Sequence, residues 1–120
     1  MTIAEAIANI DAIKPNSYTT AEKAAWLSSL DGRIKNEVLD RYEGETEFEE
    51  YSASDTSTEL LVPSPYDRIY EYYLAGEIDR CNGEITLYNN DAALFNSAFS
   101  GFRNYYNTVH TYKGRKIRII

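Results

Sequence analysis

The one pair of side chains that could act together as nucleophile and base is Cys81 with His110, the single cysteine and the single histidine of the chain. Such a pair works when the thiolate is stabilised and a third group orients the histidine. Neither residue lies in a sequence context that supplies this. Cys81 instead falls at apolar spacing in a helical pattern, which favours a small buried hydrophobe. A lone thiol forms no internal disulfide and fits a reducing compartment.

Carboxylates are the commonest chemically active groups, with 19 Asp and Glu against 12 Lys and Arg among 120 residues and a net charge of −7. A carboxyl that acts as a general acid needs a pKa raised by its surroundings. Pairs such as Asp67/Glu71 and Glu5/Asp11 are expected in an acidic helical chain, and nothing in the sequence indicates that burial raises the pKa of a carboxyl. The acidic stretch 43–50 lacks the glycine-centred pattern of a calcium loop. Loose binding of divalent cations there stays an alternative.

The usual motifs of catalytic and cofactor sites are missing from the sequence. It contains no glycine-rich phosphate loop, no His-Glu-x-x-His and no Gly-x-Ser-x-Gly. We therefore predict no catalytic residue, no cofactor and no dedicated metal site, and hence a protein that is not an enzyme.

Two apolar stripes in the C-terminal half predict the helices around which the chain is organised. Steps of three and four residues are the spacing of one helix face. Pro65 suits the first turn of the first helix, because its missing N–H needs no partner there. The first stripe consists of Tyr66, Ile69, Tyr70, Tyr73, Leu74, Ile78 and Cys81, and the second of Leu87, Leu94, Phe95, Ala98, Phe102, Tyr105 and Val109.

The segment 82–91 decides whether these stripes belong to one helix or to two. Asn82-Gly83 favours a helix end at 82–85 and an antiparallel hairpin. One long bent helix that runs to about residue 110 is the alternative. Polar residues at 89–91 favour turns over helix interiors, so a second break there, with Asp91 as a cap, is a less favoured prediction.

The N-terminal half carries two further helix signals. Thr2 can cap a short helix that ends at Lys14, since a residue before proline avoids the helical region. Thr19 with Glu22 forms a capping box for the next helix, which Gly44 would stop. The predicted core positions are Ile3, Ile7, Ile10 and Ile13, then Ala24, Leu27, Leu30, Ile34, Val38 and Tyr42, whereas Asp31, Arg33, Lys35, Asn36 and Asp40 are placed on other faces.

Residues 43–64 are predicted to form a loop. Between 43 and 59 there are seven acidic residues and no lysine or arginine, and 51–58 has the composition of a loop. Phe48 and Tyr51 are candidates to pin it, and a short strand at 47–51 or 59–62 is an alternative. The run 60–62 is expected to pack under the start of the main helix. The acidic residues are Glu43, Glu45, Glu47, Glu49, Glu50, Asp55 and Glu59.

Residues 113–120 predict a basic arm with the alternation of a strand. In a helical chain such a strand leaves backbone groups unpaired unless another protein or subunit supplies an edge. A frayed end is the alternative, and four positive charges are a thin footprint for duplex DNA. The arm residues that we assign to an interface are Lys113, Arg115, Lys116, Ile117, Arg118, Ile119 and Ile120.

The sequence as a whole predicts one all-α domain, 1–120, built as a small bundle of about four helices. Eleven tyrosines suit half-buried surfaces and subunit interfaces. Trp26 and Tyr72 lie off the main stripes and are candidates for a subunit interface. No apolar run approaches the roughly 20 residues of a membrane span, and the first residues lack the basic start of a signal peptide.

The C-terminal half resembles a group of phage and prophage proteins, the head–tail connector (adaptor) proteins of long-tailed phages. The resemblance covers the C-terminal half and has no short diagnostic signature, and the acidic insert has no counterpart in it. The residues that carry it are Val62–Asp67 (Val-Pro-x-Pro-Tyr-Asp), Tyr70–Leu74, Ile78-Asp79, Asn82–Glu84, Tyr88–Asn90 and Leu94–Asn96.

This resemblance implies a structural virion protein at the head–tail junction, made in the host bacterial cytoplasm. Copies would form a ring, dodecameric when assembled, that lies below the portal, extends the DNA channel and docks the head-closure or tail protein. DNA would pass without specific binding, and no membrane is involved. The acidic loop would line the channel or contact a neighbour, and the arm would anchor in the portal or a neighbour.

A second function stays open on the sequence. The chain could be a small cytoplasmic helical adaptor or regulator of a phage or prophage that binds one protein partner through its tyrosine-rich face. Such a protein would form no ring.

Overall fold

The computed structural model describes residues 1–42, 44 and 47–110, and these form four α-helices and one short 3-10 helix. No strand occurs in this described part. The alternative prediction of a short strand at 59–62 is reduced to one isolated antiparallel bridge, between Thr2 and Glu59. The all-α prediction is confirmed. The elements are α1 (Ile3–Ile13), α2 (Thr20–Glu37), η1 (Leu39–Arg41), α3 (Arg68–Cys81) and α4 (Ile85–Val109).

The starts of α1 and α2 follow from their capping residues, as predicted. The hydroxyl of Thr2 accepts a hydrogen bond from the N–H of Glu5, whose carboxylate accepts one from the N–H of Thr2. Thr19 and Glu22 make the same reciprocal pair at α2. These bonds satisfy N–H groups that have no partner within a helix. α1 ends at Ile13, two residues before Pro15.

The capping box of α2 gives a first testable prediction. Thr19→Ala is expected to lower the free energy of unfolding by about 1 kcal/mol, because an N-cap hydroxyl is lost. Chemical denaturation measures this change. Thr20→Ala is the matched control, since this exposed neighbour is the first residue of the helix rather than its cap. Equal losses in the two variants would contradict the assignment of the cap.

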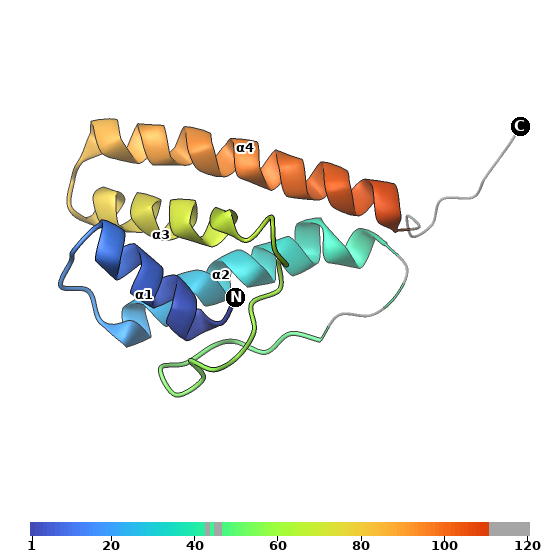
Figure 1. Cartoon of the computed structure of the whole chain (residues 1–120), viewed down its shortest axis with the longest axis horizontal. Coiled ribbons are helices and arrows are strands. Elements are labelled where there is room, and N and C mark those ends of the chain that lie inside the picture. Colours follow the sequence, from blue (N-terminus) through green and yellow to red (C-terminus); the bar gives the residue numbers. More distant parts are fainter. Residues whose placement is uncertain (43, 45–46, 111–120) are drawn as a thin grey trace, which may run out of the picture.

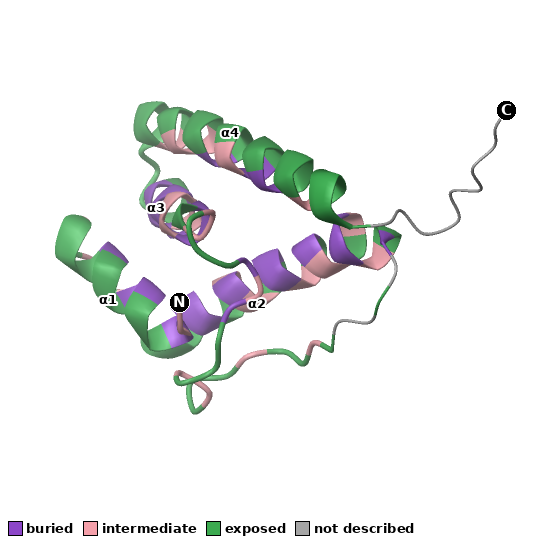
Figure 2. Cartoon of the chain, turned by 45° about the vertical axis from the view of Figure 1, so that its right-hand side comes forward, coloured by how far each residue is buried: buried purple, intermediate pink, exposed green. Residues whose placement is uncertain are grey.

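The core lies between α1, α2 and α3, whose buried faces point toward one another (Figures 1 and 2). Predicted core positions that are buried here include Ile3, Ile10, Leu27, Ile34 and Val38. Two predictions for this region are wrong. Ile13 is 61% exposed, because α1 ends there beyond the edge of the core, and Asp31 is 0% exposed rather than on an outer face.

The segment after α2 differs from the predicted single helix with a stop at Gly44. α2 ends at Glu37, and η1 continues the chain to Arg41. Gly44, with φ of 104°, lies seven residues beyond the end of α2 and therefore does not stop that helix. Tyr42 is buried as predicted, and its hydroxyl donates to Asn107 of α4 at 2.9 Å.

α3 begins later than its sequence suggests. Its first residue is Arg68, so Pro65 precedes the helix instead of occupying its first turn, and the Ser64–Pro65 peptide is cis. Leu60 and Val62 are buried beneath this approach to α3, as predicted. Cys81 is exposed rather than buried, because it is the last residue of the helix.

The break between α3 and α4 lies where the sequence favoured it. Residues 82–84 separate the helices, and Gly83 has φ of 76°, a conformation that glycine adopts without strain. No second break occurs at 89–91, and Asp91 lies inside α4 rather than at a cap. α3 and α4 therefore form the predicted antiparallel hairpin (Figure 1).

α4 packs on α3 at the outside of the bundle, and its far side faces solvent (Figure 2). Its buried residues are Phe95, Phe99 and Phe102. The predicted second stripe is therefore wrong in part, since Phe99 was not among its residues. A helix that packs mainly on one neighbouring helix buries a narrow face and leaves the adjoining apolar residues in solvent. Those left exposed are Leu87, Leu94, Tyr105 and Val109, together with Ile85 at the start of the helix.

Candidate functional site

The loop between η1 and α3 is fixed to the bundle by the buried carboxylate of Asp31 on α2. The hydroxyl of Tyr51 donates to Asp31 Oδ2 at 2.5 Å, and the N–H of Leu61 donates to the same oxygen at 3.0 Å. The N–H of Tyr51 also donates to the hydroxyl of Ser28, at 3.1 Å. Tyr51 therefore pins the loop, as predicted, and Asp31 is the acceptor that the sequence did not reveal.

The same carboxylate also connects the loop to α3. The hydroxyl of Tyr70, which is 0% exposed, donates to Asp31 Oδ1 at 2.6 Å and accepts from the N–H of Val62 at 2.8 Å. Burial raises the pKa of Asp31, while the hydrogen bonds from Tyr51, Tyr70 and Leu61 lower it in part. Burial, followed by the charge of Asp31, raises the pKa of Tyr70. One carboxylate thus connects α2, α3 and two points of the acidic loop, Tyr51 and Leu61.

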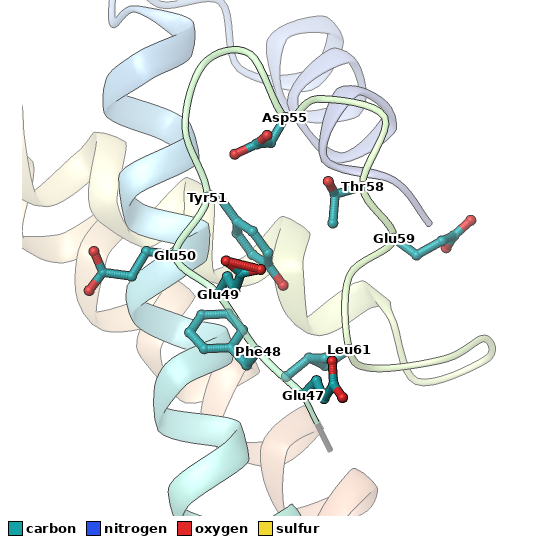
Figure 3. A pocket seen from close by; sticks show the side chains of 9 residues that line it. All are labelled: Glu47, Phe48, Glu49, Glu50, Tyr51, Asp55, Thr58, Glu59 and Leu61. Carbon is teal, nitrogen blue, oxygen red and sulfur yellow. The ribbon is translucent and has the colours of Figure 1, made fainter. Parts of the chain in front are cut away.

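This anchoring shapes an acidic pocket of about 310 Å³ on the surface of the loop (Figure 3). Phe48, Tyr51 and Leu61 contribute apolar surface, and the rings of Phe48 and Tyr51 meet edge to face at 5.3 Å. Apart from Thr58, the other lining residues are carboxylates. The acidic residues of the pocket are Glu47, Glu49, Glu50, Asp55 and Glu59.

The pocket carboxylates differ in how far they are already satisfied. Asp55 accepts hydrogen bonds from the N–H and the hydroxyl of Ser52, at 3.0 and 2.9 Å. Glu59 lies 3.1 Å from the amino group of Met1. Glu49 and Glu50 are exposed to solvent. Negative charge beside an aromatic and aliphatic surface suits a partner that presents basic and apolar side chains together.

The structure brings together five of the seven acidic residues that the sequence singled out. Glu43 and Glu45 lie outside the described residues, as does the whole basic arm, 113–120. Among the described residues, no group of three or more His, Cys, Asp or Glu is arranged to hold a metal ion.

The two predicted interface residues lie on different helices. Trp26 is half-buried on α2, with its ring edge to face with that of Tyr18 at 5.5 Å. Tyr72 is half-buried on α3 and lines a groove of about 210 Å³ between α3 and α4. Neither is in the acidic pocket, and their role in an interface stays a prediction.

Cys81 and His110 are held apart by the length of α4. Cys81 ends α3, and His110 follows the last residue of α4 and stacks on Tyr106 at 3.7 Å. A helix of 25 residues is roughly 38 Å long. The fold therefore does not assemble the thiol and imidazole into a nucleophile–base pair.

A second carboxyl cluster, which sequence reasoning missed, lies where α3 and α4 meet the end of α1. Asp79 of α3 is 2% exposed and lies 3.1 Å from Lys14 Nζ. Burial and the neighbouring Asp79 raise the pKa of Asp91 on α4. Nothing in the sequence indicated a carboxyl whose pKa is raised by burial, yet burial raises the pKa of Asp31 and of Asp91.

Comparisons with protein families, with curated proteins and with solved structures gave no match to this chain. In the described part of the chain, none of the helices combines the length and the apolar character that crossing a membrane requires.

Proposed function

We propose that this chain is a structural component of a phage particle, a head–tail connector whose copies form a ring beneath the portal. The observation that carries the proposal is the residue pattern from Val62 to Asn96 that resembles such connectors. In the fold these residues form the approach to α3, α3 itself, the turn and the first half of α4. The pattern therefore falls on one continuous structural unit.

The exposed side of α4 supports an assembly of copies. Leu87 is 45% and Leu94 42% exposed, and Tyr105 and Val109 extend the same side along the helix. The charged residues of α4 are Asp91 and Arg103. A helix face with apolar side chains and few charges has the composition of an interface core. In the proposed ring this face meets the neighbouring copy.

The acidic loop supports the part of the proposal that concerns DNA. It lies on the side of the bundle away from α4 (Figures 1 and 2). Carboxylates repel phosphates, so a channel wall with this charge lets DNA pass without gripping it. The pocket also has the chemistry to receive basic and apolar side chains, which the arm of a neighbouring copy carries.

The mass of the protein in solution, measured by light scattering with and without a portal assembly, tests this function. We expect a cyclic complex, either free or bound to the portal. A monomer seen without the portal does not contradict the proposal, since connectors can be monomers in isolation and form their ring only once the portal is present. A monomer whose mass does not change with the portal would contradict it and favour the single-partner adaptor.

The arm is tested in the same assay. Deletion of residues 113–120 is expected to abolish assembly with the portal, because it removes four positive charges and three isoleucines. The helical circular dichroism signal should stay intact. A matched variant in which the four basic residues become glutamine separates charge from apolar contact. Unchanged assembly after the deletion would mean that the arm does not contribute to assembly with the portal.

A further inference from the structure

Two carboxyl groups face each other between α3 and α4. Burial, followed by the hydrogen bond and the charge of Asp79, raises the pKa of Asp91. Oδ2 of Asp91 is buried and makes no hydrogen bond among the described residues, and Oδ2 of Asp79 is likewise buried with only the ammonium of Lys14 beside it, at 3.1 Å. The helices approach closely here, since a Cβ built on Gly76 of α3 would lie 3.6 Å from the Cβ of Asp91.

One lysine serves both carboxyls. Lys14, the C-cap of α1, lies 3.1 Å from each oxygen of Asp79, and its hydrogen bond goes to Oδ1. If one carboxyl of the pair holds a proton, it donates to the other, and the remaining single negative charge matches the lysine. If neither holds a proton, two like charges face each other with no donor between them, which costs free energy in a partly desolvated site.

The other charged and titratable groups near the pair leave the preference for a single negative charge unchanged. Burial, then the hydrogen bond and charge of Asp79, raise the pKa of Asp91 to about 7, while Lys14 lowers it in part. Glu77 and Arg80 of α3 pair with each other at 2.9 Å. The groove beside Asp91 is also lined by Arg33 of α2, which pairs with Glu37, by Tyr72 and Tyr73 of α3, and by Tyr88 of α4.

We propose that Asp79 and Asp91, with Lys14, form a proton-dependent latch that holds the first half of α4 on α3. The latch is closed while one carboxyl carries a proton and is weakened when both are ionised. This inference does not depend on the connector function, because it concerns the α3–α4 hairpin of a single chain.

The direction of the pH effect follows from the raised pKa. An unfolded aspartate loses its proton near its ordinary value of 3.8, whereas the folded pair keeps one up to about 7. The latch therefore contributes all of its stability below about pH 4 and loses it as the pH rises toward 7. Other carboxyls act in the opposite direction, so the effect has to be measured as a difference between variants.

Thermal unfolding of Asp91→Asn and of the unmodified protein tests the latch. The amide of asparagine donates to Asp79 at every pH, so the variant should melt at least about 5 °C higher than the unmodified protein at about pH 8, and the difference should shrink toward pH 4. Asp40→Asn is the matched control, since Asp40 pairs with Lys35 at 2.9 Å. The control should show no such gain. Equal destabilisation of Asp91→Asn at both pH values would overturn the proposal.

A second measurement locates the effect and a third needs no variant. At one alkaline pH, amide hydrogen exchange in residues 85–95 should be slower in Asp91→Asn than in the unmodified protein, while exchange in α2 stays equal.

In the unmodified protein, carboxyl-carbon NMR should show an aspartate that titrates near 7. Titration of every aspartate below about pH 5 would overturn the proposal even if the variant failed to fold.

Discussion

Replacing Asp31 by alanine is expected to lower the free energy of unfolding by about 3 kcal/mol, a large part of the stability of a domain of this size. The variant loses the acceptor for Tyr70 at 2.6 Å and for the N–H of Leu61 at 3.0 Å. Donors that stay buried without an acceptor cost about 1–3 kcal/mol each. The removal of a carboxylate whose pKa is raised by burial offsets a part of this loss.

Chemical denaturation measures this change, and Asp40→Ala provides the matched control. Asp40 is paired with Lys35 at 2.9 Å near the surface, and such pairs contribute between 0 and about 1 kcal/mol. Partial proteolysis within 47–61 adds a local readout, because the loop should be cut faster once Tyr51 and Leu61 lose their acceptor. A loss in Asp31→Ala no greater than in Asp40→Ala would mean that Asp31 does not anchor the loop.

The elements that the sequence predicted best are those whose signals are local. Thr2 and Thr19 each cap a helix through a residue three positions away, and Gly83 turns the chain at the α3–α4 break. Steps of three and four residues placed Leu27 and Ile34 in the core. Each of these inferences needs nothing beyond one helical turn of sequence.

The buried carboxylates were missed because their partners are far away in the sequence. Asp31 was predicted on another face of α2, although its position four residues after Leu27 and three before Ile34 is compatible with the buried face. Its polarity argued against that position, and the donors that make burial tolerable come from the loop and from α3. Asp79 and Asp91 likewise meet only once the hairpin closes. Charge and spacing can flag such residues, but only the fold supplies their partners.

The candidate site was predicted in composition but not in shape. The run of acidic residues indicated a charged loop, and five of them line one pocket. The sequence marked Phe48 as a candidate to pin the loop and 60–62 as a run that packs. It did not indicate that Phe48 and Leu61 line one pocket with the carboxylates, because the pocket exists only where Asp31 holds Tyr51 and Leu61 against α2. The described fold thus ties the surface with the clearest binding chemistry to one core residue.

Phe102→Ala is expected to lower the free energy of unfolding by about 3–5 kcal/mol, because it empties a fully buried site. Phe102 is 1% exposed, and the centroid of its ring lies 6.1 Å from that of Tyr66 and 5.7 Å from that of Tyr106. The ring also lies in the half of α4 that is far from the Asp79–Asp91 latch. The decrease in the free energy of unfolding of Phe102→Ala should therefore be nearly the same at acid and neutral pH, when each is measured by chemical denaturation.

Leu94→Ala on the same helix is the control that decides which face of α4 is packed. The apolar spacing of the sequence assigns both Leu94 and Phe95 to the buried stripe, whereas the fold buries Phe95 and leaves Leu94 42% exposed. A side chain this exposed should cost less than about 1 kcal/mol when truncated. If Leu94→Ala were as harmful as Phe102→Ala, α4 would have to be rotated about its axis. Leu94 would then be core, and the exposed face that supports assembly of copies would not exist.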